Sequence, residues 1–148
     1  MKKNLLFFVV SAFSLLTLML AGCSKKDSGS SYSMASIAGT YKLTSATYTA
    51  GGVTQDGMDL FFDPCQQDDI LQFKADSTFI YTDAGTTCST DGSGTGKWYI
   101  SGNYLIQTED QNNDTATIKS FNGTALTLTT PVDLLGVPVI FAITMTKQ

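Results

Sequence analysis

The stretch that decides the fold is TATIKSFNGTALTLT, at residues 115–129, where apolar and polar side chains alternate on both sides of Asn122-Gly123. Alternation with a period of two is typical of half-buried β-strands, because successive side chains point to opposite faces of a sheet. Asn-Gly favours a tight type I′ turn, which needs a positive φ at both central residues. The stretch therefore predicts an antiparallel hairpin. The residues expected to face inward are Ala116, Ile118, Leu126 and Leu128.

The same period-two pattern recurs from residue 39 onward, between turn signals at fairly even spacing. No long helix is expected, although residues 36–39 could form one helical turn. Short antiparallel strands joined by short turns can close into an up-and-down barrel, which removes exposed sheet edges. A two-sheet β-sandwich would show the same alternation, but the even meander favours an all-β barrel. The pattern predicts about eight strands, at residues 40–49, 70–74, 78–82, 96–101, 104–109, 115–121, 125–129 and 137–147.

The first 22 residues have the composition of a bacterial signal peptide. Lys2 and Lys3 precede an apolar stretch at residues 5–20, which is shorter than the roughly 20 residues of a spanning helix. The stretch ends in LAGC, which resembles a bacterial lipobox, so Cys23 is expected to be lipidated and to become the new N-terminus. An uncleaved anchor helix is the alternative. Polar, Ser-rich residues 23–36 would form a flexible tether, and residues 37–148 the β-domain.

A lipidated Cys23 would make a membrane the first partner of the protein. One acyl chain binds a membrane only marginally, whereas two or more anchor stably, and bacterial lipoproteins of this type usually carry three. Ser24 follows the cysteine. In many diderm bacteria an Asp at this place retains the protein at the inner membrane, so Ser24 favours the outer membrane of the cell envelope. The sequence leaves open whether the domain faces the periplasm or the outside.

The composition excludes several classes of chemistry. The chain has no His and no Arg, its nine basic residues are all Lys, and Glu109 is the only Glu. Without His there is no Ser-His-Asp or Cys-His centre and no histidine metal site. The net charge of −4 disfavours nucleic-acid binding, which needs a basic footprint. We therefore expect no enzyme, no cofactor, no metal and no nucleic-acid partner.

Several short motifs resemble those of the lipocalin-like domains found on bacterial lipoproteins. GTYKLTS at residues 39–45 is similar to the opening G-T-W-K-L motif of that family, with Tyr41 in place of the usual Trp. The resemblance extends over residues 37–145 and implies a small lipocalin-type barrel with no known reaction. The other segments that carry it are Cys65 with Asp68-Asp69, LQF at 71–73, DSTF at 76–79, Cys88, GKW at 96–98 and NYL at 103–105.

Cys65 and Cys88 remain once Cys23 is assigned to the lipid. An even pair of cysteines in an exported protein predicts a disulfide. Reduced structural thiols are the alternative. A zinc site is disfavoured because the chain has no CxxC motif and no His.

Two other motifs have a structural interpretation. GSGTGK at residues 92–97 looks like a phosphate loop, but Asp91 and Trp98 stand where that motif needs Gly and Ser or Thr. We interpret it as a flexible hairpin loop. A group of Asp residues around Cys65 lacks the spacing of a calcium-binding loop and is typical of turns. Its members are Asp56, Asp59, Asp63, Asp68 and Asp69.

Bulky side chains at inward positions of the expected barrel are the candidates for a ligand site. They would line a cavity in the barrel mouth, or they would fill the core, since an eight-stranded barrel is just wide enough for its own side chains. Phe61-Phe62 and residues 134–138 could form a lid or a partner-binding patch, or close the barrel end. The cavity candidates are Tyr41, Leu43, Phe73, Phe79, Tyr81, Trp98 and Phe141.

Taken together, these features predict a lipid-anchored envelope protein whose barrel binds a small apolar or amphipathic ligand without catalysis. The alternative is a structural or interaction module. In that case the barrel would be filled, and its loops would contact another envelope protein or a polysaccharide. The sequence identifies no particular protein partner.

Overall fold

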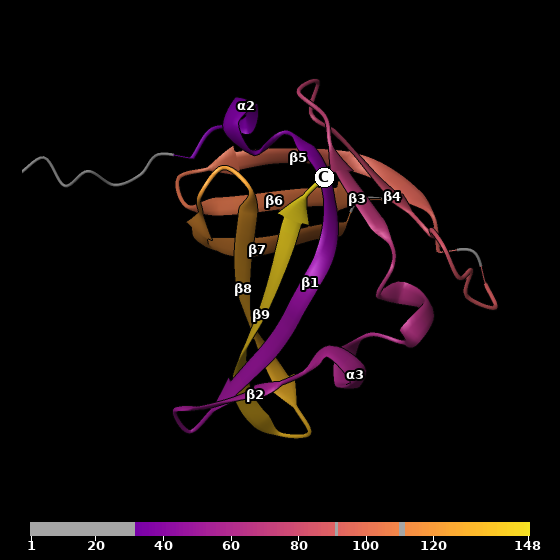
Figure 1. The fold of residues 1–148 in the computed structure, drawn as a ribbon. Helices are drawn as coiled ribbons and strands as arrows, with labels where there is room; N and C mark the ends of the chain where they lie inside the picture. The colour runs from indigo at the N-terminus through magenta and orange to yellow at the C-terminus, as the bar shows by residue number, and fades with distance from the viewer. Residues whose placement is uncertain (1–31, 91, 110–111) are drawn as a thin grey trace, which may run out of the picture. The chain divides into compact units, whose positions relative to one another are not determined.

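The computed structural model describes residues 32–90, 92–109 and 112–148 (Figure 1). The expected signal peptide, Cys23 and residues 24–31 of the expected tether lie outside the described residues. Of the helices in the described part, none is long and apolar enough to cross a membrane. The strands are β1 (Gly39–Ala50), β2 (Val53–Asp56), β3 (Ile70–Phe73), β4 (Thr78–Thr82), β5 (Gly94–Ser101), β6 (Tyr104–Glu109), β7 (Asn112–Phe121), β8 (Ala125–Leu134) and β9 (Val137–Lys147). The helical segments are α2 (Met34–Ile37), α3 (Met58–Phe61) and the 3₁₀ turn η1 (Pro64–Gln66).

The sheet closes on itself because β1 pairs with β9 as well as with β3. From β3 to β9, each strand pairs with the next one along the chain, and every pairing is antiparallel. This confirms the predicted eight-stranded up-and-down barrel, with β2 as one additional strand. The β-sandwich alternative is excluded, because its two sheets would not be joined by a continuous ring of strand pairs.

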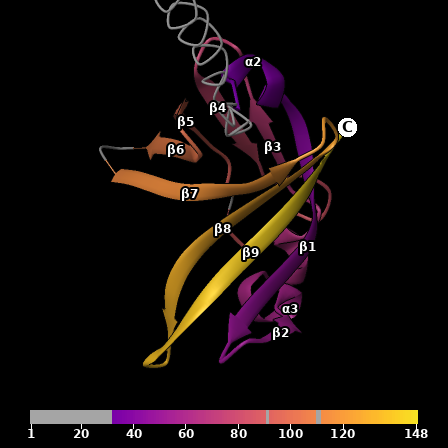
Figure 2. The same cartoon turned by 90° about the vertical axis from the view of Figure 1, so that its left-hand side faces the viewer.

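β1 is longer than the barrel requires. Residues 39–42 pair with β3, whereas residues 47–50 pair with β2 across the turn at Gly51-Gly52. Both glycines have positive φ values, 56° and 82°, as a tight hairpin turn demands. β1, β8 and β9 therefore run on past the shorter strands β3 and β4 (Figures 1 and 2). The sequence did not predict β2, because VTQD contains a single apolar residue and shows no alternation.

The β7–β8 hairpin is confirmed, but its turn differs from the expected type I′ geometry. Gly123 has a positive φ of 96°, while Asn122 does not. The Asn122 side-chain oxygen instead accepts hydrogen bonds from the backbone N–H groups of Thr124 (3.0 Å) and Ala125 (2.7 Å). A bulge between Ile118 and Ser120 shifts the register before the turn. Asn122 thus acts through its side chain, in the manner of an Asx turn.

One end of the barrel is filled by aromatic side chains beneath α2. Tyr41 and Trp98 are 0% exposed, and Phe73, 1% exposed, lies between them, with ring centroids 5.9 Å from Tyr41 and 4.8 Å from Trp98. Both polar atoms are satisfied: the Tyr41 hydroxyl donates to the Ile37 carbonyl (2.5 Å), and Trp98 Nε1 donates to the Lys74 carbonyl (2.8 Å). The helix α2 starts at Met34, two residues before the expected helical turn, and seats the fully buried Ile37 in this core. We call this region the closed end.

Candidate functional site

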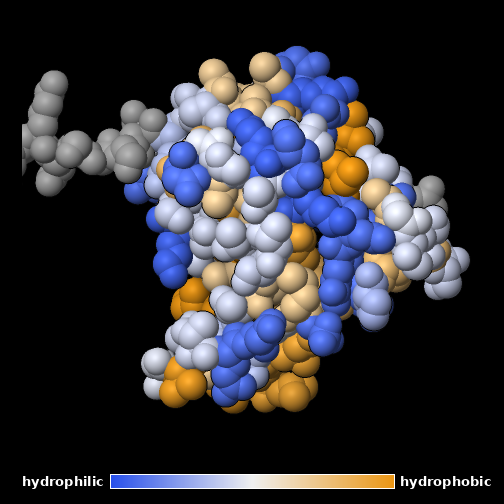
Figure 3. Space-filling model, viewed as in Figure 1, coloured by the Kyte–Doolittle hydropathy of each residue, from blue (hydrophilic) through white to orange (hydrophobic). Residues whose placement is uncertain are grey.

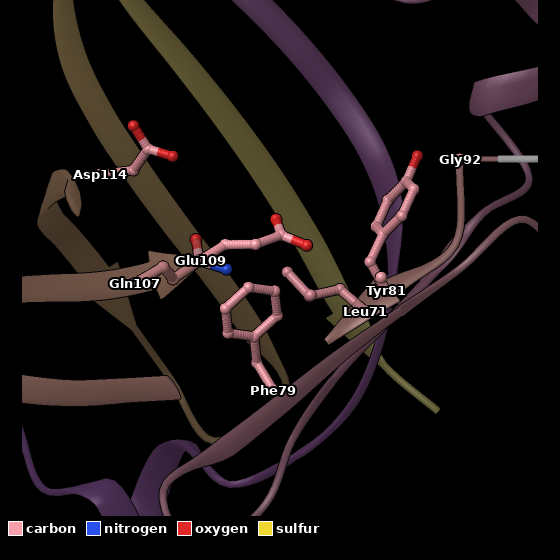
Figure 4. A pocket seen from close by; sticks show the side chains of 8 residues that line it. Leu71, Phe79, Tyr81, Gly92, Gln107, Glu109 and Asp114 are labelled. Carbon is pink, nitrogen blue, oxygen red and sulfur yellow. The ribbon is translucent and has the colours of Figure 1, made fainter. Parts of the chain in front are cut away.

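The opposite end of the barrel contains a pocket of about 270 Å³, which we call the mouth pocket (Figure 4). Strand register explains its composition: Tyr81 on β4 faces Gly94 on β5, and Gln107 on β6 faces Asp114 on β7. By alternation these residues share the inner face of the barrel. The pocket is lined by Leu71, Phe79, Tyr81, Gly92, Gly94, Gln107, Glu109 and Asp114.

Two glycines of β5 make room for the side chains of the neighbouring strands. A Cβ atom at Gly94 would lie 2.6 Å from Glu109 Oε1. A Cβ atom at Gly96 would lie 2.4 Å from both the Phe79 ring and the Thr108 carbonyl oxygen. Glycine inside a strand often marks such a close approach. The predicted loop at residues 92–97 is therefore partly wrong, since β5 begins at Gly94 and its glycines form a wall of the pocket.

Three polar side chains of the mouth pocket are available to a ligand. The side chains of Gln107, Glu109 and Asp114 form no hydrogen bond or ion pair with any residue of the described ranges. The Glu109 carboxylate reaches across the pocket toward Leu71 and Tyr81, above the Phe79 ring (Figure 4). Glu109 and Asp114 are exposed, so their carboxylates meet solvent at the opening.

Asp69 differs from Glu109 and Asp114, because it is buried and both of its carboxylate oxygens accept hydrogen bonds. It is 6% exposed, and its carboxylate accepts hydrogen bonds from the Tyr81 hydroxyl and from the Ala84 backbone N–H (3.0 Å). Burial, followed by the hydrogen bond to Asp69, raises the pKa of Tyr81 above its ordinary value. Tyr81 therefore remains a neutral donor committed to Asp69.

A second, more apolar pocket of about 100 Å³ lies against β1 and β9, and we call it the inner pocket. It shares Leu71 and Tyr81 with the mouth pocket. Leu71 and Tyr81 are cross-strand partners, so this pair forms the boundary between the two spaces. The other residues that line the inner pocket are Tyr41, Leu43, Phe62, Gln66, Asp69, Ile143 and Met145.

The segment from α3 to η1 covers the barrel beside the inner pocket. The rings of Phe61 and Phe62 lie 4.3 Å and 6.2 Å from the Phe141 ring, measured between centroids, and Phe61 also packs edge-on against Tyr48. The predicted disulfide is confirmed: Cys65 in η1 is bonded to Cys88, with a Cα–Cα distance of 5.3 Å. The bond ties this cover to the loop that follows β4.

Aspartates near the disulfide hold the same loop through backbone hydrogen bonds. Asp68 accepts from the Thr86 N–H (2.9 Å), and Asp83 accepts from the Cys88 N–H (3.2 Å). Asp56 accepts from the Met58 N–H at the start of α3 (2.9 Å). Of these three contacts, only that of Asp56, which spans two residues, is the local turn-forming role that the sequence predicted; Asp68 joins two segments that are 18 residues apart.

The expected cavity residues occupy three kinds of place. Tyr41 and Leu43 line the inner pocket, Phe79 the mouth pocket, and Tyr81 both. Phe73 and Trp98 lie in the core of the closed end, and Phe141 lies against the cover. Sequence reasoning missed Gln107, Glu109 and Asp114, because adjacent Leu105 and Ile106 obscured the alternation of β6. The sequence carries no signal that marks these polar residues as inward; only the structure fixes the register, in which Leu105 is 1% exposed and Gln107 and Glu109 follow it at period two.

Comparison with known families gave one finding that bears on these pockets. A family model described as a lipocalin-like domain matches residues 37–128, from the end of α2 into β8. This range contains every residue that lines the mouth pocket. The comparison with curated proteins gave no match.

Proposed function

The chain belongs to the lipocalin-like domain family, and from this premise we propose that it is a non-catalytic binder of a small apolar or amphipathic ligand. The family is in general non-enzymatic. We further propose that lipid on Cys23 anchors the protein to the outer membrane of a bacterial cell envelope.

The observation that carries the binding proposal is the mouth pocket together with the inner pocket. The mouth pocket alone, at about 270 Å³, is slightly smaller than typical ligand sites, which run from about 300 to 1,000 Å³, and the inner pocket adds about 100 Å³ beside it. Apolar walls with a few convergent polar groups are typical of such sites. We assign Phe79 and Tyr81 to ligand contact in the mouth, and Tyr41 and Leu43 to contact with any part that reaches the inner pocket. Phe73, Trp98 and Phe141 would support these residues from behind.

Native mass spectrometry tests the binding proposal. Residues 31–148 form a compact unit by themselves, so the chain from Ser24 onward, exported in a bacterial host, is a suitable sample. We expect a co-purifying mass that disappears after organic extraction and returns when the extract is added back. A bare protein that also gains no mass from the extract of its own host would contradict the proposal.

The anchoring proposal is supported by the order of the basic residues, the apolar stretch and the LAGC sequence at the N-terminus. The test uses the full chain expressed in a diderm host, followed by separation of inner membrane, outer membrane and soluble fractions. We expect the protein in the outer-membrane fraction, with a mass that shows acyl chains on Cys23. Unchanged fractionation of the Cys23→Ala variant would contradict lipid anchoring.

The interaction module remains a second candidate because of the β8–β9 turn. Leu135 is 98% exposed and has a φ of 55°, which is unfavourable for a side chain of this size. Apolar surface gathers over the end of this hairpin (Figure 3), where Val137 is 50% exposed. This turn therefore projects an apolar residue into solvent, which fits a partner-binding patch better than closure of the barrel end. Loss of a co-purifying protein in the Leu135→Asn variant, without loss of a small ligand, would favour this candidate.

A further inference from the structure

We propose that the mouth pocket selects a small organic cation, an ammonium compound with an apolar or aromatic portion, over neutral and anionic compounds of the same size. This inference rests on the proposed ligand-binding function and deepens it. It concerns the charge of the ligand, which neither the fold nor the family determines.

The first argument is the set of polar groups that the pocket leaves unused. Glu109 and Asp114 lie on neighbouring strands as diagonal partners on the inner face, so their Cα atoms are roughly 7–8 Å apart. Gly94 has no side chain, and its place is taken by the Glu109 carboxylate. Because Tyr81 and Asp69 already bond to each other, the groups left for a ligand are two carboxylates and the Gln107 amide.

The second argument is the position of the basic residues. None of the five lysines in the described ranges lines either pocket. Lys147 lies at the closed end. Its ammonium group is 5.6 Å from the centre of the Tyr41 ring and donates a hydrogen bond to the Ser36 carbonyl oxygen (3.4 Å). Lys97 bonds to Thr78 (3.2 Å). An anion in the mouth pocket would therefore face two carboxylates with no compensating lysine from the described part of the chain, and like charges repel in a partly enclosed site.

The third argument is the floor of the pocket. Phe79 is 4% exposed and lies beneath Glu109, and Leu71 and Tyr81 complete an apolar and aromatic surface (Figure 4). An ammonium group is attracted both to carboxylates and to the faces of aromatic rings. An alkyl tail attached to it would lie against Leu71, at the boundary with the inner pocket. The mouth pocket thus offers complementary partners to both halves of a cationic amphiphile.

The test compares three probes with the same tail at pH 7: octyltrimethylammonium, octanol and octanoate. Isothermal titration calorimetry on residues 24–148 at low salt is expected to show at least about tenfold tighter binding of the ammonium probe than of octanol, and weaker binding of octanoate. Raising the salt concentration should reduce the difference, since exposed charges are screened. Equal affinities, or a preference for octanoate, would overturn the proposal while leaving a small-ligand site in place.

The Glu109→Gln/Asp114→Asn double variant locates the selectivity. It should lose the preference for the ammonium probe, so that the affinities for the ammonium probe and for octanol fall within about twofold of each other. The matched control is Asp56→Asn/Asp133→Asn, which removes the same charge outside both pockets and keeps a side-chain oxygen for the N–H groups of Met58 and Gly136. If the control loses the preference equally, net charge and not the pocket is responsible. If no probe binds and no ligand co-purifies, both this proposal and the proposed function fail.

Discussion

At the closed end of the barrel the inward positions carry Tyr41, Phe73 and Trp98, all within 1% of complete burial. At the mouth the inward positions of β6 and β7 carry Gln107, Glu109 and Asp114, whose side chains form no hydrogen bond or ion pair with the described residues. The two regions share one sheet and one alternation pattern, so strand geometry does not distinguish them. The difference lies in side-chain volume and polarity: the closed end is packed for stability, and the mouth gives up packing to leave a space.

The largest expected effect is the loss of Trp98 at the closed end. Trp98→Ala should lower the free energy of unfolding by about 3–5 kcal/mol, because it leaves a cavity and removes the hydrogen bond from Trp98 Nε1 to the Lys74 carbonyl, which keeps only its bond from the Ser77 N–H. Gln107→Ala in the mouth should change it by less than about 0.5 kcal/mol. Urea denaturation followed by circular dichroism measures the stability of both variants. Tryptophan fluorescence is unsuitable, because Trp98 is the only tryptophan and Trp98→Ala removes the signal. Similar costs at the two sites would show that the mouth is also packed for stability.

The disulfide beside the mouth is expected to have the next largest effect. Cys65 and Cys88 are separated by 23 positions, and closing a loop of this length stabilises the folded state by about 3 kcal/mol in the chain-entropy model. Cys65→Ser/Cys88→Ser should therefore lower the urea midpoint. A reductant should lower the midpoint of the wild-type protein and leave that of the variant unchanged. A variant that resists urea as well as the wild type would show that the Asp68 and Asp83 contacts hold the loop without the bond.

Gly94 and Gly96 allow a comparison within one strand. A methyl group at Gly96 meets the Thr108 backbone and the buried Phe79 ring, so Gly96→Ala should cost about 1–3 kcal/mol through overpacking. A methyl group at Gly94 meets only the end of the exposed Glu109 side chain, which can move aside. Gly94→Ala should leave stability within about 0.5 kcal/mol and weaken the binding of the ammonium probe. A larger loss of stability at Gly94 would indicate that Glu109 is held rigidly.

The fold was predictable because its signals are local. Alternation between turn signals located the eight barrel strands, although that of β6 was ambiguous, and two-residue turns such as Asn122-Gly123 marked some of the hairpins. The mouth was not predictable to the same degree, for a physical reason. Polar residues at inward positions, such as Gln107 and Asp114, look the same in sequence as outward residues when the register is unknown. Likewise, the additional strand β2 depends on the long β1 and on the Gly51-Gly52 turn, not on alternation of its own.

Tyr41 makes the closed end sensitive to alkaline pH. Burial raises its pKa from 10.0 to about 12. The unfolded chain releases the phenolic proton near pH 10, while the folded chain holds it, so stability should be constant below pH 10 and fall as the pH rises toward 12. Tyr41→Phe should have lower stability at pH 7, because it loses the hydrogen bond to Ile37, but a flatter alkaline profile. Urea midpoints between pH 8 and 12 measure this, and parallel profiles for the two proteins would refute it.

The smallest expected effect has the opposite sign. Leu135 and Gly136 both have positive φ values, 55° and 84°, so they form the tight turn that favours Asn-Gly. Leu135→Asn should therefore stabilise the protein by about 0.5–1 kcal/mol, since Asn tolerates the left-handed region and no buried contact is lost at a residue that is 98% exposed. The urea midpoint should rise slightly and the binding of the ammonium probe should not change. A fall in stability would mean that Leu135 makes a stabilising contact in solution, whereas a rise would mean that the chain keeps an unfavourable residue at this turn despite its cost to folding.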